Sequence, residues 1–253
     1  MQRTVLVVAG TDSSGGAGLV RDVQVLTELG VRIRCVVTAI TAQSDQRVRA
    51  THFVSADVVR QQMLAALEDG EIDAIKIGML GTRATIEAIM EMLPSPDQTP
   101  IVLDPVITAS SGGALLEVSG LNLLRNCLIP RVTIVTPNLP ESAILLDTEP
   151  AADEATMVTQ ARRLMQIGAR AVLLKGGHGC GTEVVDVLSC VSSSAPMRLR
   201  GPRVDAVLRG TGCALSSAMA AWLAAGAPLA EACERARRYV LAALRRASSQ
   251  TGS

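Results

Sequence analysis

A segment near the C-terminal end of the chain has residue types suited to holding a phosphoryl group. Gly210-Thr211-Gly212-Cys213 precedes a run of helix formers that ends at Gly226, which predicts a tight turn followed by a buried helix. Backbone N–H groups at a helix N-terminus lack partners within the helix and carry partial positive charge. We therefore expect this turn to bind a phosphate or a developing oxyanion. Cys213 lies in the first helical turn, where we expect its thiolate to be favoured; the alternative is a capping turn in which Cys213 only fills apolar space.

The glycine-rich segment after the first predicted strand is a second candidate for contact with a ligand. Residues 4–9 predict a buried strand, and four glycines occur from Gly10 to Gly18, before a helix predicted to end at Gly30. The spacing matches neither a dinucleotide fingerprint nor a Walker A loop. We expect the backbone here to approach a small ligand closely, because glycine lacks a Cβ; the alternative is an ordinary turn between strand and helix.

Gln43 follows a second strand, predicted over residues 33–40. Open α/β sheets bind ligands beyond the carboxyl ends of their strands. A side-chain amide at that place can both donate to and accept from the edge of a heterocycle. The alternative is an exposed loop glutamine without a ligand.

Charged and amide side chains near later strand ends complete the candidate chemistry. Asp104 and Glu141 can hold Mg²⁺ directly or through water, and Asn138 can orient that shell. Lys175 can neutralise a phosphoryl group together with the amides of the turn at Gly210; the alternative is a solvated lysine. Phosphoryl transfer requires this kind of positioning and charge neutralisation.

Strands and helices alternate along the chain, which brings these loops to one edge. Alternation predicts a parallel sheet covered on both faces, and loops after parallel strands share an edge. We find no linker or repeat, and expect one domain over residues 1–253 with a frayed tail from about residue 247. The remaining predictions are strands over 72–80, 101–106, 132–136 and 171–175, helices over 55–69, 82–93, 153–167 and 229–246, a helix opening at 137–141, and a hairpin of 186–190 with 197–200.

The composition argues against several classes of protein. The 253 residues contain 24 Lys and Arg against 24 Asp and Glu, so no overall charge attracts nucleic acid or acidic membranes. Phe53, Trp222 and Tyr239 are the only aromatic residues, too few to stack the bases of a single strand. The six cysteines form no CxxC pair, which argues against zinc. Without a secretory signal or a membrane-length apolar run, we expect a cytoplasmic protein with reduced thiols.

Seven motifs, in order along the chain, carry a resemblance to a known family. They lie at residues 9–18, 38–43, 76–80, 103–106, 136–141, 175–178 and 210–213. From about residue 4 to 245, the chain resembles the hydroxymethylpyrimidine/phosphomethylpyrimidine kinases of thiamine biosynthesis, within the ribokinase-like superfamily. The resemblance implies a three-layer α/β/α sandwich with a mostly parallel central sheet. It also implies ATP- and Mg²⁺-dependent phosphorylation of 4-amino-5-hydroxymethyl-2-methylpyrimidine, then of its monophosphate, by a homodimer.

The resemblance further implies roles for individual residues. A cysteine at the position of Cys213 marks the pyrimidine kinases, where the wider superfamily usually has Asp. Cys213 would take the proton of the substrate hydroxyl while the turn amides stabilise the transferring group, although positioning alone could suffice. The implied catalytic residues are Cys213, Gly210, Thr211, Gly212 and Lys175; the substrate-binding residues are Gly10, Asp12, Ala17, Gln43, Met79 and Val106; the ATP-binding residues are Lys175, Asn138, Gly177, Thr211 and Gly212; and the Mg²⁺ ligands are Asp104 and Glu141.

Three positions depart from the family pattern in ways that bear on the substrate. Ser110 replaces a usual Lys, Gly113 a usual Asp, and Arg209 a usual His. Because one basic group near the second phosphate is lost and another is gained, we expect the second phosphorylation to be affected more than the first. The alternatives are a pyridoxal-type vitamin B6 kinase and a non-catalytic pyrimidine sensor on the same fold; Gln43 and Cys213 favour the pyrimidine kinase.

Overall fold

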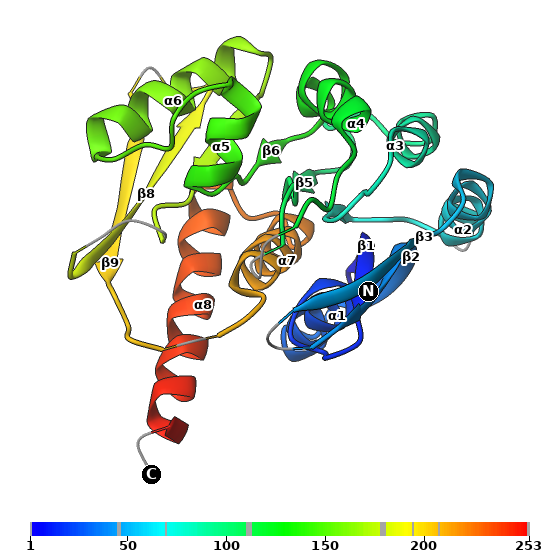
Figure 1. The fold of residues 1–253 in the computed structure, drawn as a ribbon, viewed down its shortest axis with the longest axis horizontal. Helices are drawn as coiled ribbons and strands as arrows, with labels where there is room; N and C mark the ends of the chain where they lie inside the picture. The colour runs from blue at the N-terminus through cyan, green and yellow to red at the C-terminus, as the bar shows by residue number, and fades with distance from the viewer. Residues whose placement is uncertain are drawn as a thin grey trace.

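A nine-stranded sheet, in the order β3-β2-β1-β4-β5-β6-β7-β8-β9, runs through the centre of the molecule (Figure 1). The computed structural model describes residues 2–44, 47–68, 70–109, 113–177, 181–193, 195–206 and 208–251. Strands β2-β1-β4-β5-β6-β7 are parallel, whereas β3, β8 and β9 join the edges antiparallel. The strands are β1 Thr4–Asp12, β2 Arg32–Gln43, β3 Val48–Phe53, β4 Ala74–Ile77, β5 Ile101–Leu103, β6 Ile134–Val135, β7 Ala171–Leu174, β8 Glu183–Cys190 and β9 Met197–Pro202.

Helices cover both faces of the sheet, which makes three layers (Figure 1). Alternate residues of β1 show why: Leu6 and Val8 pack into the core under α2 to α6, whereas Val5 and Val7 pack into the core under α1, α7 and α8. The predicted three-layer, mostly parallel sandwich is therefore confirmed. The helices are α1 Gly18–Glu28, α2 Ala56–Glu68, α3 Arg83–Met90, α4 Val118–Leu123, α5 Leu139–Leu146, α6 Glu154–Gln166, α7 Thr211–Ala224 and α8 Leu229–Thr251, with a π-helical turn at Leu124–Leu128 and a 3-10 turn at Ile129–Arg131.

Four elements differ most from the predictions. Gln43 belongs to β2 rather than to a loop, because β3 turns back and pairs with this end of β2, placing Ala42 opposite Ala50. Strand β3 was missed because it is half-exposed and lacks the apolar run that identifies a buried strand. Helix α4 was missed because Gly120, which packs closely against α3, interrupts its helical pattern. Helix α8 continues through Thr251, so the frayed tail predicted from about residue 247 is wrong over its described part.

The strand order places a crevice at the carboxyl end of β1. Strand β1 lies between β2 and β4, so the chain leaves it in one direction through α1 and returns on its other side at β4. In open α/β sheets, ligands bind where the strand order reverses in this way. Among the described residues, no helix combines the length and the apolar composition needed to cross a bilayer.

Candidate active site

The turn before α7 packs directly against the glycine-rich loop after β1. Gly210 has a φ of 72°, in the left-handed region that favours glycine. A Cβ at this position would lie 2.4 Å from the carbonyl oxygen of Gly16 and 3.1 Å from the Cα of Ala17. The two glycine-rich segments that the sequence singled out, about 195 residues apart, are therefore in contact, and only glycine fits between them.

Lys175 and Asp104 meet beside the same turn. The Nζ atom of Lys175 lies 2.8 Å from Oδ1 of Asp104, and both side chains are largely buried. A Cβ on Gly212 would lie 3.2 Å from that Nζ and 3.4 Å from Oδ2 of Asp104. The ends of β5 and β7 and the start of α7 thus converge, as the strand-end argument predicted.

Glu141 and Asn138 enter the site from the start of α5. The Asn138 side chain accepts from the Glu141 N–H, and the Glu141 carboxylate accepts from the Asn138 N–H, both at 2.8 Å. This capping box fixes the Glu141 side chain, while Asn138 pairs with Lys175 through a bridge between the ends of β6 and β7. Burial, with a smaller contribution from Asp104, raises the pKa of Glu141 to about 7, although Lys175 opposes this shift.

The two carboxylates fit a magnesium ion that arrives with a nucleotide. Among the described residues, no three His, Cys, Asp or Glu side chains are grouped so as to hold a metal ion. Magnesium in kinases commonly takes one or two carboxylates and completes its shell with water and substrate phosphates. Asp104 and Glu141 are both buried carboxylates whose charges interact, which is the donor set that such an ion needs.

The expectation that the thiolate of Cys213 is favoured is wrong. Burial raises the pKa of the Cys213 thiol to about 11, and the carboxylates of Asp22 and Asp104 act in the same direction. The ammonium of Lys76 and a hydrogen bond with the Gly18 backbone oppose the shift without overcoming it. The helix N-terminus therefore does not suffice to ionise this thiol at neutral pH.

A buried ion pair whose charges act on Cys213 was missed by the sequence analysis. Lys76 of β4 and Asp22 of α1 lie 2.7 Å apart, both with 0% of the side chain exposed. Ser217 of α7 donates to the other oxygen of Asp22 at 2.7 Å. Burial alone would lower the pKa of Lys76, but the nearby negative groups, Asp22 first, outweigh it and raise this pKa. The signal that could have found the pair is a lysine within the apolar run of β4.

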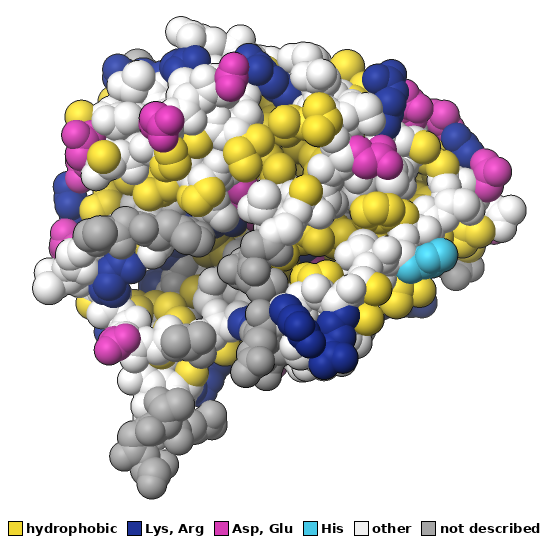
Figure 2. Space-filling view, in the orientation of Figure 1, with side chains coloured by type: hydrophobic (Ala, Val, Ile, Leu, Met, Phe, Trp, Pro, Cys, Tyr) yellow, Lys and Arg dark blue, Asp and Glu magenta, His cyan; other side chains and the backbone are white. Residues whose placement is uncertain are grey.

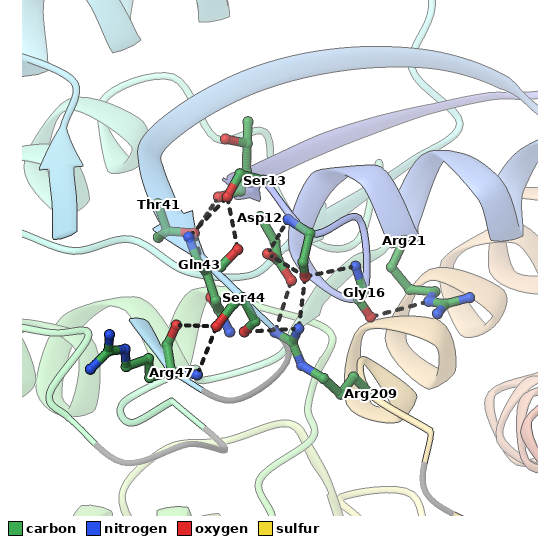
Figure 3. Close-up of polar contacts among 11 residues, drawn as sticks. Asp12, Ser13, Gly16, Arg21, Thr41, Gln43, Ser44, Arg47 and Arg209 are labelled. Atoms are coloured by element: carbon green, nitrogen blue, oxygen red, sulfur yellow. Dashed lines mark hydrogen bonds and ion pairs between the residues drawn. The ribbon is translucent and has the colours of Figure 1, made fainter. Parts of the chain in front are cut away.

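The residues predicted to bind the substrate lie around the ends of β1, β2, β4 and β5. A Cβ on Gly10 would lie 2.9 Å from the sulfur of Met79, whose carbonyl accepts from the hydroxyl of Thr38 at 2.5 Å. Gln43 is partly exposed at the end of β2, where its backbone N–H donates to the Ser13 hydroxyl (Figure 3). Of the remaining three predicted residues, Asp12 ends β1, Ala17 is the N-cap of α1 and Val106 follows β5.

The loop after β7, which contains Gly177, is held by two arginines. Arg203 donates to the Gly177 carbonyl at 2.9 Å. Asp186 accepts from the Gly176 N–H at 2.7 Å and pairs with Arg237 of α8 at 2.6 Å. The sequence analysis missed this bracing; its signal was an aspartate flanked by valines in the middle of β8.

Ser110, which departs from the family pattern, and His178, the last residue of the motif at 175–178, lie outside the described residues. Figure 2 shows the molecule hollowed near the centre of the drawn face, with hydrophobic side chains on the wall above and Lys and Arg side chains below.

Comparisons with known proteins agree with this geometry. A profile of the family described as phosphomethylpyrimidine kinase matches residues 12–253. The hydroxymethylpyrimidine/phosphomethylpyrimidine kinase of Rhizobium meliloti is 43% identical over 245 residues, which cover 96% of this chain and 91% of that protein. The crystal structure of phosphomethylpyrimidine kinase from Clostridium difficile superposes with a TM-score of 0.83 at 32% identity, covering 96% of this chain and 100% of that one. The pyridoxal kinase of Staphylococcus aureus, in complex with AMP-PCP and pyridoxal, gives a TM-score of 0.84 at 28% identity, with coverage of 95% and 87%.

Fold and site together define a small-molecule kinase of the ribokinase-like class. Within this class, the chain belongs to the phosphomethylpyrimidine kinase family, because the family profile and the Rhizobium relative both span nearly its whole length. The predicted family, fold and enzyme class are confirmed, and membership in a kinase family implies the use of ATP.

Proposed function

We propose that the protein transfers the γ-phosphoryl group of ATP to the hydroxyl of 4-amino-5-hydroxymethyl-2-methylpyrimidine, and then phosphorylates the monophosphate to the diphosphate. The observation that carries this proposal is the convergence of Lys175 and Asp104 at Gly212 in the turn before α7. A cation, a carboxylate and a set of helix N-terminal amides in one place suit phosphoryl transfer. The substrate comes from the family to which the chain belongs.

In this proposal the pyrimidine lies across the ends of β1, β2 and β4. Gly10 leaves space beside Met79, whose thioether provides an adaptable apolar wall. The side-chain amide of Gln43 pairs with the polar edge of the ring. Val106 and Ala17 close the sides, and the hydroxymethyl group points to the turn at Gly210.

The transfer itself requires few covalent roles from the protein. The substrate oxygen forms a bond to the γ-phosphorus as the bond to the ADP oxygen breaks, and the hydroxyl proton passes to the thiolate form of Cys213. Lys175 and the amides of Thr211 and Gly212 stabilise the charge on the transferring group. Asn138 and Gly177 orient the nucleotide. Magnesium held by Asp104 and Glu141 would neutralise further phosphate charge.

In this proposal Cys213 accepts the proton of the substrate hydroxyl in its thiolate form. With a pKa of about 11, only a small fraction of the thiol is ionised at neutral pH, so we assign most of the rate to positioning and charge neutralisation. Replacing Cys213 with alanine is expected to lower kcat while leaving substrate binding within a few-fold. Equal kcat in Cys213→Ala and wild type would remove the residue from the proton-transfer step.

Product formation from three alcohols tests the substrate assignment. ADP release is measured with the hydroxymethylpyrimidine, its monophosphate and pyridoxal side by side, with mass spectrometry of the products. The fold likeness to a pyridoxal kinase makes pyridoxal the competing substrate. Turnover of pyridoxal alone would overturn the proposal, and tight pyrimidine binding without ATP consumption would favour a sensor.

The location and assembly of the protein remain part of the proposal. An ATP-dependent step on a free vitamin precursor fits the cytoplasm. We also propose a homodimer, which light scattering on the purified protein would test.

A further inference from the structure

Arg209 joins three segments that are distant in the sequence and meet at the substrate end of the sheet (Figure 3). These segments are the end of β1 with its loop, the end of β2, and the turn before α7. We propose that Arg209 is a positioning residue, which holds the loop after β1, on the pyrimidine side, against the turn whose amides stabilise the transferring phosphoryl group. The contacts of Arg209 that join the loop after β1 to the turn before α7 are called the tie below. The expected kinetic effects rest on the proposed function, whereas the tie itself does not.

The contacts of Arg209 use both ends of the guanidinium fork. Its Nη2 atom lies 2.9 Å from Oδ2 of Asp12, and its Nη1 atom donates to the hydroxyl of Ser14 at 2.7 Å. Nη1 also reaches the carbonyl of Ser44 at 3.4 Å. A Cβ on Gly16 would lie 3.2 Å from Nη1 and 3.4 Å from Cζ, so the guanidinium lies close against the glycine backbone.

The loop after β1, which accepts these hydrogen bonds, is itself ordered by the Asp12 carboxylate. Asp12, which is buried, accepts through its second oxygen from both the N–H and the hydroxyl of Ser14, at 2.9 and 2.8 Å. The Ser13 hydroxyl in turn bonds to the backbone of Gln43, as acceptor and as donor, at 2.9 Å. A charge-assisted fork on this network therefore orders the loop and the strand end that carries Gln43.

Arg209 directly precedes Gly210, the first residue of the turn before α7. Gly210 already packs against Gly16, as described above, and Arg21 of α1 donates to the Gly16 carbonyl at 3.4 Å. A shift of the loop at Gly16 is thus transmitted to the turn at Gly210, and a shift of the turn is transmitted to the loop. Because phosphoryl transfer depends on placing the acceptor oxygen against the γ-phosphorus, this tie couples the substrate pocket to the reacting group.

The same contacts argue against Arg209 as a direct ligand of the substrate phosphate. Its charge is already paired with Asp12, only 19% of its side chain is exposed, and its donors are engaged by protein oxygens. Binding a phosphate would require it to leave these partners. The positioning role and the ligand role therefore predict different kinetics.

The test compares Arg209→Gln and Arg209→Lys with Arg47→Gln in the full-length protein. Arg47 lies near Ser44, but its side chain points away from Arg209 in Figure 3, so its replacement removes a nearby charge and leaves the tie intact. For Arg209→Gln we expect kcat to fall about tenfold for the alcohol and the monophosphate alike. We expect KM for ATP to stay within about twofold. Lysine can keep the pair with Asp12 but not the fork, so Arg209→Lys should recover only part of the lost kcat.

Hydrogen exchange on the ligand-free protein gives a readout that does not need the kinase activity. In Arg209→Gln, the amides of residues 13–18 and of 210–213 should exchange faster together, whereas Arg47→Gln should match wild type. Unchanged exchange in either segment would overturn the tie. A loss of activity confined to the monophosphate would also overturn it, and would make Arg209 a phosphate ligand. If the wild-type protein phosphorylates neither pyrimidine, the proposed function fails, while hydrogen exchange still decides the role of Arg209.

Discussion

Replacing Lys76 with methionine should be one of the most destabilising single changes in the protein. The ammonium of Lys76 lies 2.7 Å from Asp22, and neither side chain is exposed. Methionine fills a similar volume but leaves the Asp22 carboxylate buried, with Ser217 as its remaining donor among the described residues. Breaking a buried pair from one side costs about 3–5 kcal/mol, because a charge stays uncompensated.

That cost is a large part of the stability of a typical domain, which is about 5–15 kcal/mol. With a urea dependence of about 3 kcal/mol per molar, the midpoint of unfolding should fall by about 1–2 M. The assay is urea denaturation at neutral pH, followed by circular dichroism. The control is Arg83→Met, which breaks an exposed pair with Glu87 on α3 and should cost less than about 0.5 kcal/mol.

The double variant Asp22→Asn/Lys76→Met separates the ion pair from general packing. Asparagine can still accept from Ser217 but carries no charge, so the double variant should regain at least half of the stability lost in Lys76→Met. A loss below about 1 kcal/mol for Lys76→Met, or additive losses in the double variant, would refute the argument from burial.

Three further predictions concern the site itself. Gly212→Ala should lower kcat/KM for ATP at least about tenfold, because the new Cβ would lie 3.2 Å from Lys175 Nζ. The control is Gly201→Ala, whose new Cβ would have its nearest neighbouring atom at 3.8 Å. Equal losses of kcat/KM in both variants would contradict this reasoning. Glu141 has a pKa of about 7 in place of the usual 4.5, so the folded protein holds an extra proton between these values. Relative to Glu141→Gln, which keeps the capping box, metal-free wild type should therefore lose stability as pH rises from 4.5 to 7, by at most about 3 kcal/mol. Urea unfolding at several pH values measures this loss, and a parallel pH dependence of the two proteins would exclude the raised pKa of Glu141. The Cys213 thiol, with its pKa raised to about 11, should react with iodoacetamide much more slowly than in denatured protein at pH 8 and accelerate only towards pH 11; rapid labelling at pH 7, measured by peptide mass spectrometry, would show an ionised thiolate instead.

Local patterns were sufficient to predict most elements and the convergence of their ends. The apolar run at the start of β1, the capping residues Asn138 and Glu141 of α5, and the glycine before α7 each reflect short-range chemistry that the fold preserves. Because parallel strands share a carboxyl edge, the meeting of Asp104 and Lys175 followed from the alternation of strands and helices. Strand β3 escaped prediction because its stability comes from pairing with β2 rather than from its own sequence pattern.

What the sequence alone determined is therefore the set of elements, their layering and the chemical types at the strand ends. Only the tertiary structure decided the state of those groups. The pair of Lys76 with Asp22 spans 54 residues and that of Arg209 with Asp12 spans 197, and the raised pKa of Cys213 comes from burial among groups on other elements. The physical reason is range: propensity and periodicity act over a few residues, whereas desolvation and charge pairing depend on neighbours that only the packed chain brings together.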